Sequence, residues 1–187
     1  ACLVGSEMCI RDRRKPSPME RAIYSVANLL LFRPLKDKHG LSNLRHGITS
    51  GAAISPDTLR FFRAMGINLK QIYALTETGV ITGHCDDDIR FESLGVPVGE
   101  AKKVRISEAG EVLVDAAYCC DGYYKDDDAY QGAIRDGWFH TGDAGYIQDD
   151  GHLIYLDRMA DLKKLAGGNI FSPQYIESRL KFSPYIL

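Results

Sequence analysis

Apolar residues recur at helical spacing between residues 18 and 32, where Ala22, Val26, Leu29, Leu30 and Phe32 cluster along the chain. This pattern predicts an amphipathic or core helix. Its apolar stretch, residues 22–32, is shorter than the roughly 20 apolar residues that a membrane span needs, and it contains Asn28.

A strand–helix–strand order is predicted over residues 44–75. Residues 44–49 and 71–75 are candidates for short strands, and Ser55-Pro56 is typical of a helix N-cap followed by the first turn. Gly66 is a suitable C-cap for that helix. Strands that alternate with helices favour a parallel α/β unit.

Short β-like runs separated by glycine-containing turns occupy residues 94–156. The runs are 104–106, 111–114, 145–147 and 153–156, and the turns 108–110 and 149–151 have the composition of hairpin loops. This part of the chain is therefore predicted to form a small antiparallel barrel or sheet. Ser172-Pro173 is expected to begin a last helix that carries Tyr175, Ile176 and Leu180.

The first residues of the chain follow no periodic pattern. The run CLVGSEMCIRDR resembles translated sequencing-adapter sequence, so residues 1–17 are expected to be a non-native segment. An α/β part is expected at 18–93, a β-barrel subdomain at 94–156 and a further segment at 157–187. Because the sequence stops within an apolar run, we expect it to be a fragment of a longer protein.

Composition narrows the class of protein. Of the 187 residues, 45% are hydrophobic and 26% are charged, which is typical of a globular chain with a core and excludes collagen-like, coiled-coil and mostly disordered chains. The net charge of −2 argues against a general nucleic-acid binder. Five cysteines without a CxxC pair argue against a disulfide framework or zinc knuckle, so a cytoplasmic location is expected.

Three polar clusters are interpreted without a catalytic role. His84-Cys85-Asp86-Asp87-Asp88 suggests a metal site, but its consecutive side chains cannot all face one ion without an unusual loop, so a solvated loop is the preferred interpretation. Asp126-Asp127-Asp128 is expected to begin a helix, where acidic side chains favour the dipole. Tyr123 and Tyr124 are expected to be half-buried packing residues.

The segment Tyr73-Ala74-Leu75-Thr76-Glu77-Thr78 lies at the end of a predicted parallel strand, where open α/β sheets place their ligands. An aromatic ring, a hydroxyl and a carboxylate at that point can stack a base, contact a phosphate and hold Mg²⁺. The alternative is a strand followed by an ordinary polar loop.

Two later segments also carry candidate groups. In Gly137-Trp138-Phe139-His140-Thr141-Gly142-Asp143 a carboxylate is available to a ribose diol, and the alternative is a hairpin with an aspartate cap. In Leu156-Asp157-Arg158-Met159-Ala160-Asp161 an arginine follows a predicted strand. That arginine either binds phosphate or ribose or forms a surface ion pair.

Together and in this order, these segments resemble the adenylate-forming superfamily of acyl-CoA synthetases, luciferases and adenylation domains. YALTET is similar to the motif Y-G-x-T-E, GEVL followed by GYY to G-E-[IL]-x…G-Y-Y, GWFHTGD to [WY]-x-x-T-G-D, and LDRMAD to the hinge element [GD]-R-x-x-[DE]. The segments FRPLK, FSPQYIE and KFSPYI are similar to bacterial long-chain fatty-acyl-CoA synthetases, and the resemblance covers roughly residues 18–187.

The resemblance implies a fold, a reaction and site residues. Residues 18–156 would belong to the large N-terminal domain, and residues 157–187 to the hinge and the truncated start of the C-terminal domain. ATP and a fatty acid would form an acyl-adenylate and pyrophosphate, and coenzyme A would then accept the acyl group. The residues assigned to the nucleotide site are Ser50, Gly51, Ala52, Ala53, Tyr73, Ala74, Leu75, Thr76, Asp143 and Arg158, with Thr76 and Glu77 as catalytic residues and Glu77 as the Mg²⁺ ligand.

Individual roles follow by motif position. Residues 50–53 would lie beside the adenine and the acyl group, Tyr73 would stack on adenine, and Thr76 would contact the α-phosphate. Asp143 would accept hydrogen bonds from both ribose hydroxyls, and Arg158 would contact ribose or phosphate. A metal ion and fixed donors would stabilise the negative charge of the transition state.

The chain departs from the superfamily in several places. The glycine-rich phosphate loop and the C-terminal lysine have no counterpart in these residues, so the chain alone is expected to be inactive. Ala74 replaces the motif glycine, and Ala160 replaces the usual Asp or Lys of the hinge. The alternative is a non-catalytic nucleotide-binding relative. Fatty acid, ATP and CoA are the expected partners. Contact with the inner face of the membrane is left open, and no partner protein can be inferred.

Overall fold

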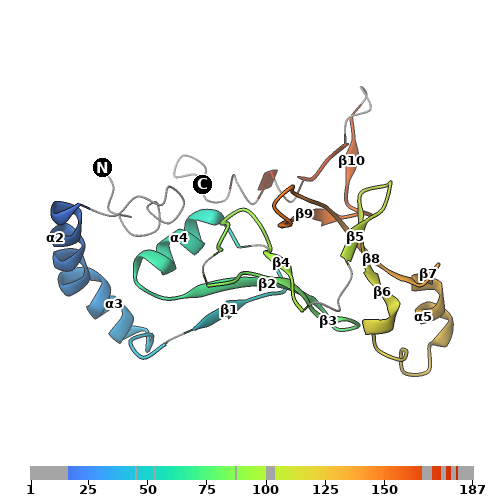
Figure 1. Cartoon of the computed structure of the whole chain (residues 1–187), viewed down its shortest axis with the longest axis horizontal. Coiled ribbons are helices and arrows are strands. Elements are labelled where there is room, and N and C mark those ends of the chain that lie inside the picture. Colours follow the sequence, from blue (N-terminus) through green and yellow to red (C-terminus); the bar gives the residue numbers. More distant parts are fainter. Residues whose placement is uncertain are drawn as a thin grey trace. The chain divides into compact units, whose positions relative to one another are not determined.

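The structure, a computed structural model, describes residues 17–44, 46–52, 54–86, 88–99, 104–165, 170–173, 176–177 and 180. The chain divides into two compact units, which are described separately (Figure 1). Unit 1 comprises residues 1–49 and 56–70, and unit 2 comprises residues 50–55 and 71–187. Both β-rich regions lie within unit 2, so the expected boundaries after residues 93 and 156 stay predictions about its internal organisation.

Unit 1 begins with a continuous helical segment made of α2 (Pro18–Ala27), the π-helical turn η1 (Asn28–Phe32) and α3 (Arg33–Lys38). Ser17 starts it with a capping box, in which the Glu20 N–H donates to Ser17 Oγ and the Ser17 N–H donates to Glu20 Oε2. The helix runs past its expected end at residue 32. Pro34 lies in the first turn of α3, where a missing N–H costs little.

The core of unit 1 is small. Phe32, Met65 and Ile67 are buried together, whereas Leu29, Leu30 and Leu31 of η1 are exposed. Helix α4 (Pro56–Ala64) begins where Ser55-Pro56 predicts it, and Gly66 follows it with a φ of 80° as a C-cap glycine. Strand β1 (Gly47–Thr49) is shorter than expected, and its Gly47 N–H donates to Asn68 O.

The first sheet has four strands in the order β1-β2-β3-β4, and its strands β3 (Gly79–Gly83) and β4 (Val96–Pro97) belong to unit 2. Strand β2 (Leu69–Leu75) begins in unit 1 and continues into unit 2. It pairs antiparallel with β3, and the register shifts between Tyr73 and Ala74. The sequence analysis did not predict β3, which follows the polar turn at residues 76–78.

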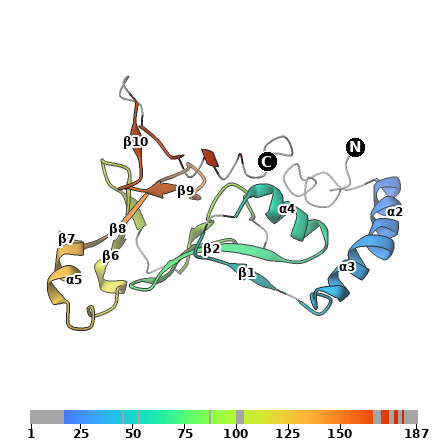
Figure 2. The ribbon, with the colours of Figure 1, turned by 180° about the vertical axis from the view of Figure 1, so that it is seen from behind.

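The second sheet of unit 2 is antiparallel and contains five strands in the order β5-β6-β8-β7, with β9 paired to β8. Their bounds are β5 Val104–Ile106, β6 Glu111–Asp115, β7 Ile134–Arg135, β8 Trp138–Ile147 and β9 Leu153–Arg158. The predicted hairpins β5–β6 and β8–β9 are confirmed, and Figure 2 shows this sheet from behind. Strand β8 begins seven residues earlier than predicted, so Asp143 lies inside a strand.

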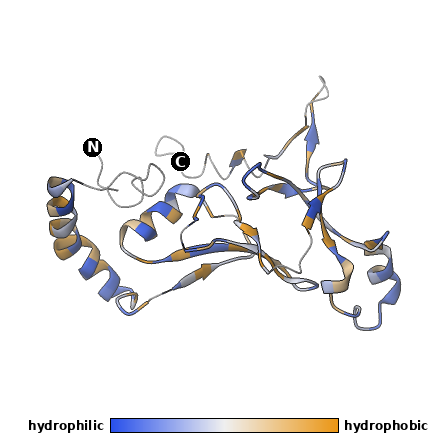
Figure 3. Cartoon of the chain, in the orientation of Figure 1, coloured by the Kyte–Doolittle hydropathy of each residue, from blue (hydrophilic) through white to orange (hydrophobic). Residues whose placement is uncertain are grey.

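The remaining elements are short. They are η2 (Ala116–Tyr118), α5 (Asp127–Ala133), β10 (Lys163–Lys164) and β11 (Ile170–Phe171), and β10 pairs with β11. Asp126 caps α5 by accepting from the Ala129 N–H, which confirms the predicted acidic helix start. Helix α5 and strand β10 are hydrophilic in Figure 3. The expected helix after Ser172 falls largely on residues outside those described.

One hydrophobic core joins the two sheets of unit 2. Its buried members are Tyr73, Ile81, Leu94, Val112, Val114 and Leu153. Tyr73 comes from the first sheet and Val112 from the second, so packing holds the end of β2 against the β6–β8–β9 region. Within the described part of the chain, no helix is both long enough and apolar enough to cross a membrane.

Candidate functional site

A cavity of about 290 Å³ lies within unit 2. Seven residues of the predicted nucleotide site line it: Gly51, Ala52, Tyr73, Ala74, Leu75, Asp143 and Arg158. Five lining residues were not predicted: Gln71, Ile72, Leu94, Tyr155 and Asp161. The structure therefore brings together segments that are as far apart in the chain as residues 51 and 158.

The Asp143 carboxylate is the central polar group of this cavity. Its residue is only 2% exposed, and its Oδ2 accepts a 2.5 Å hydrogen bond from the Tyr73 hydroxyl. Arg158 Nη1 lies 3.0 Å from Oδ1 and forms an ion pair with it. The N–H groups of Arg158 are not aligned for a hydrogen bond to Oδ1, which accepts none within the described part of the chain. Oδ1 of Asp143 thus has an ion-pair partner but no hydrogen-bond donor among the described residues.

Burial affects the ionisation of both members of this pair. Burial raises the pKa of the Tyr73 hydroxyl, and the hydrogen bond to Asp143 raises it further, so this group donates at neutral pH. Burial also raises the pKa of Asp143, while the Tyr73 hydrogen bond and the Arg158 charge act in the opposite direction. A further hydrogen-bond donor would therefore stabilise the charged form of the Asp143 carboxylate.

Arg158 reaches this carboxylate from the end of β9. It is the partner of Asp143 in the β8–β9 register, and its Nη1 also donates to Thr141 O at 3.1 Å. The Met159 N–H donates to Gly142 O at 2.8 Å, which keeps the two strand segments together. Because its side chain is 53% exposed, the guanidinium can also contact a ligand in the cavity.

Residues of the GWFHTGD segment attach β8 to β6 next to Asp143. Thr141 Oγ1 donates to Val112 O at 2.7 Å and accepts from the Asp143 N–H at 3.1 Å. Glu111 accepts from the Gly142 N–H at 2.9 Å and pairs with His140 Nδ1 at 2.8 Å. The residues around Asp143 therefore fix its position through β6.

Thr76 and Glu77 lie outside the cavity lining, in the turn between β2 and β3. Thr76 is exposed, and Glu77 Oε1 accepts a 2.6 Å hydrogen bond from the Tyr123 hydroxyl. Ser50 does not line the cavity either, and Ala53 lies outside the described residues. Glu77 follows the last lining residue of β2, Leu75, by only two positions.

Among the described residues there is no group of three or more side chains that could hold a metal ion by themselves. Mg²⁺ usually takes one or two carboxylates and completes its shell with water and substrate phosphates. One carboxylate two positions after a residue that lines the cavity fits that requirement. Within the described part of the chain, Glu77 Oε2 accepts no hydrogen bond.

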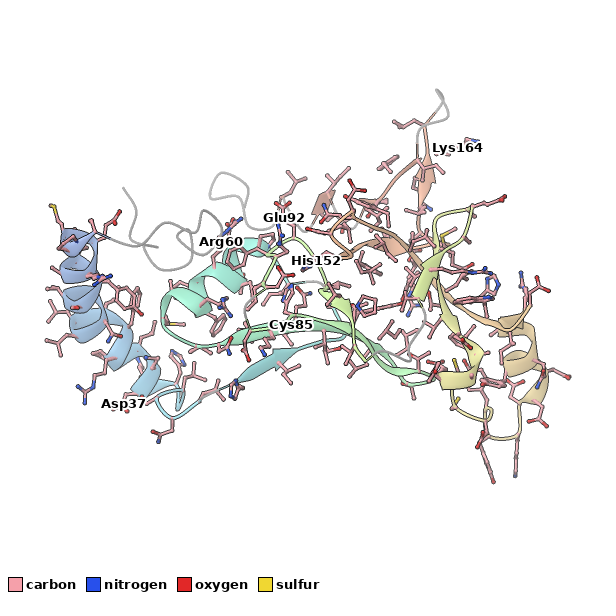
Figure 4. The ribbon with its side chains drawn as sticks, viewed as in Figure 1. Asp37, Arg60, Cys85, Glu92, His152 and Lys164 are labelled. Carbon is pink, nitrogen blue, oxygen red and sulfur yellow. The ribbon has the colours of Figure 1, made fainter. Side chains whose placement is uncertain are left out.

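A buried network supports the cavity residues that the sequence analysis missed. Ser93 lies 2.8 Å from His152 Nδ1, and Asp88 Oδ2 lies 2.9 Å from His152 Nε2. His84 Nδ1 accepts from the N–H of the lining residue Gln71. His152, which is labelled in Figure 4, has no exposed surface. The solvated-loop interpretation of residues 84–88 is wrong for His84, which is 6% exposed, because its ring is needed as a partner inside the fold.

The chemistry of the cavity suits a ligand that offers hydroxyl donors next to an anionic group. A buried carboxylate with an open acceptor prefers a diol, because charge-assisted hydrogen bonds are strong. An arginine beside it can bind a phosphate oxygen. Apolar lining residues, such as Leu94 and Ala52, leave room for a flat ring.

A sequence family described as "AMP-binding enzyme" matches residues 19–124, which are more than half of the chain. The chain belongs to the family of AMP-binding enzymes. This confirms the superfamily expected from the four motifs. It also agrees with the mixed α/β fold, although the match ends before Asp143 and Arg158.

Individual AMP-binding enzymes show the same relationship. The chain is 32% identical over 182 residues to the long-chain-fatty-acid–CoA ligase FadD15 of Mycobacterium bovis, covering 97% of this chain and 30% of that protein. It is similar to the O-succinylbenzoate coenzyme A synthetase MenE of Bacillus subtilis in complex with AMP, with a TM-score of 0.68 and 25% identity over 82% of this chain and 34% of that one.

A further solved structure belongs to an enzyme with a different activity. The amide bond synthetase Mcba of Marinactinospora thermotolerans, solved as a K483A mutant, gives a TM-score of 0.69 and 26% identity over 95% of this chain and 39% of that chain. The chain thus spans about a third of the length of the relatives it matches.

Proposed function

We propose that this chain is the nucleotide-binding part of an ATP-dependent long-chain fatty acid–CoA ligase. The complete reaction converts a fatty acid and ATP into an acyl-adenylate and pyrophosphate, and then transfers the acyl group to coenzyme A. The observation that carries the proposal is the buried Asp143 carboxylate, whose Oδ1 accepts no hydrogen bond from the described residues and whose residue lines the cavity together with six further residues of the predicted site.

The ribose is assigned to Asp143. Its two oxygens can each accept from a hydroxyl of the diol, and the hydrogen bond from the Tyr73 hydroxyl to Oδ2 fixes the orientation of the carboxylate. Arg158 is assigned to the ribose or the α-phosphate, since its guanidinium is half exposed beside the same carboxylate. These two assignments explain why an arginine and a buried aspartate are neighbours across β8 and β9.

The adenine is assigned to the part of the cavity between residues 51–52 and the end of β2. Gly51 has a φ of 87°, and no atom lies within 4 Å of the position of a Cβ there, so the backbone leaves space for a base. The Tyr73 ring is only 7% exposed. A stacking contact with adenine would therefore use the small part of the ring surface that lines the cavity, with Ala74 and Leu75 beside it.

The phosphates are assigned to the turn that follows β2. Thr76 is exposed there and offers a hydroxyl to the α-phosphate, and Glu77 offers a carboxylate oxygen to Mg²⁺. The metal ion supplies positive charge to the phosphates when it is bound. The protein's own contribution is to hold the carboxylate and the hydroxyl at the point where the nucleotide leaves the cavity.

The acyl group and its acceptor are proposed from relatives. The long-chain-fatty-acid–CoA ligase named above supports a long-chain fatty acid and coenzyme A. An amide bond synthetase of similar fold shows that the activities of relatives differ. A cytoplasmic location, with contact to the inner face of the membrane, is proposed for an enzyme that takes fatty acids from lipid surroundings.

Two measurements test the proposal. The purified 187-residue chain should bind AMP in a calorimetric titration, but it should release no pyrophosphate from ATP and palmitate. The protein that carries this chain together with the missing parts of the fold should release pyrophosphate and, with coenzyme A, form palmitoyl-CoA. A folded chain that does not bind AMP would contradict the site. Binding without pyrophosphate release by the longer protein would favour a non-catalytic nucleotide-binding relative.

A further inference from the structure

A hydrogen bond joins two segments of unit 2 that are 46 residues apart. The Tyr123 hydroxyl donates to Glu77 Oε1 at 2.6 Å. The backbone of Glu77 is held from the same side, because the Cys120 N–H donates to Glu77 O at 2.7 Å. Residues 120–123 therefore contact both the side chain and the main chain of Glu77.

Tyr123 is itself held by the second sheet. Its ring packs edge-on against Tyr130 with 5.5 Å between the ring centroids, and Tyr130 is buried and packs against Phe139 of β8. The Tyr130 hydroxyl also donates to Cys120 O. The segment that touches Glu77 is thus anchored on the strand that carries Asp143, so the hydroxyl of Tyr123 occupies a defined position.

The consequence for Glu77 is a loss of side-chain freedom. A glutamate in a turn has three rotatable bonds, and fixing it for a ligand costs entropy. Tyr123 orders the carboxylate before any ligand arrives and uses only Oε1.

The geometry points to Tyr123 as the positioning residue that orients Glu77 toward the Mg²⁺ of the bound nucleotide, with Oε1 held by the phenol and Oε2 left for the cation. This inference rests on the proposed function, since it needs ATP in the cavity. The inference gives a positioning role to Tyr123, for which the sequence alone indicated packing. It also distinguishes Tyr123 from Tyr124, the second tyrosine of the GYY segment.

The matched control lies next in the chain. Tyr124 is 88% exposed, and the ammonium group of Lys125 lies 5.1 Å from the centroid of its ring. Tyr124→Phe therefore also removes a tyrosine hydroxyl, but one that makes no contact among the described residues comparable to the hydrogen bond between Tyr123 and Glu77. Tyr123→Phe removes the hydroxyl but keeps the ring that packs on Tyr130. Glu77→Gln keeps an acceptor for Tyr123 and removes the charge that a hard cation requires.

The experiment measures the Kd of ATP for the 187-residue chain, once with excess Mg²⁺ and once with EDTA. The ratio of the two values reports the metal-dependent part of binding and needs no turnover. Wild type should bind ATP more tightly with Mg²⁺. Tyr123→Phe should reduce the ratio by about 2- to 12-fold, the range expected for one hydrogen bond. Tyr124→Phe should leave it unchanged, and Glu77→Gln should bring it close to one.

A double-mutant cycle separates positioning from a packing defect. In the Glu77→Gln background, Tyr123→Phe should have no further effect on the ratio, because the charge that it orients is gone. An effect of equal size in both backgrounds would overturn the inference, as would an unchanged ratio in Tyr123→Phe or in Glu77→Gln. If wild type binds no ATP in either condition, the proposed function itself fails and the inference fails with it.

Discussion

The Tyr73 hydroxyl donates to Asp143 Oδ2 across 2.5 Å and leaves Oδ1 of the same carboxylate without a hydrogen bond. One oxygen thus fixes the orientation of the side chain, and the other has the Arg158 charge beside it but no hydrogen-bond donor in the described part of the chain. The pair joins the end of β2 to the middle of β8 in the lining of the cavity. Four predictions follow from this arrangement and from the segments that support it.

Replacing Asp143 should weaken nucleotide binding through the ribose. Asp143→Asn keeps an acceptor for Tyr73 but removes the charge, and Asp143→Ala removes both. The lost hydrogen bonds to a diol correspond to about 1–3 kcal/mol, so the Kd of ATP should rise by roughly 5- to 150-fold in the alanine variant. Calorimetric titration of both variants and of wild type provides the measurement.

The control for this substitution is 2′,3′-dideoxy-ATP, which has no diol. Its affinity should hardly change between wild type and the two variants. Equal weakening of both nucleotides would show that Asp143 is a structural residue of β8 and that the ribose assignment is wrong.

As the pH is lowered, adenosine binding should weaken at a higher pH than it would with an ordinary aspartate. Burial raises the pKa of Asp143, so this carboxylate becomes protonated at a pH above the ordinary aspartate pKa of about 4. Adenosine is the suitable ligand because it has no phosphate that titrates in this range. Its Kd, measured from pH 7 to pH 4.5, should rise in wild type and stay level in Asp143→Asn. A flat wild-type profile would contradict the prediction.

The Ser93 hydroxyl should stabilise unit 2 through His152. Ser93→Ala leaves a ring nitrogen of the fully buried His152 and the Gly95 N–H without their hydroxyl partner. Unpaired buried polar groups cost about 1–3 kcal/mol each, so the free energy of unfolding should fall by at least that amount. Urea unfolding of Ser93→Ala and Ser25→Ala makes the comparison, since the Ser25 hydroxyl bonds to Arg21 O on an exposed helix surface. Equal losses in both variants would refute a special role for Ser93.

Gly95 should tolerate no side chain. An added Cβ would lie 2.0 Å from both the carbon and the oxygen of the Gly83 carbonyl, and the φ of Gly95 is 78°. Gly95→Ala should therefore cost more than about 4 kcal/mol, the range of severe core defects. Gly99 has a φ of 83° but no atom within 4 Å of its Cβ position, so Gly99→Ala should lose only about 1–2 kcal/mol from backbone strain. Thermal unfolding of the two variants distinguishes steric clash from strain.

Local features of this chain were predictable because their causes lie within a few residues. The hairpin turns end in Gly110 and Gly151, which both have a φ of 85° that glycine adopts without strain. The helix start at Pro56 and the cap at Asp126 depend on neighbouring residues in the same way. The motifs also identified the family, since they record residue types and their order along the chain.

The partners of the site residues were decided only by the tertiary structure. Tyr73 and Asp143 are 70 residues apart, Ser93 and His152 are 59 apart, and Tyr123 and Glu77 are 46 apart. Each pair depends on strand order and on register shifts such as the one between Ala144 and Gly145, and no local propensity encodes these. The sequence by itself determined which chemical groups are present and where the hairpin turns and helix starts lie. The packing of two sheets around one core determined that a phenol, rather than water, orients Asp143 and Glu77.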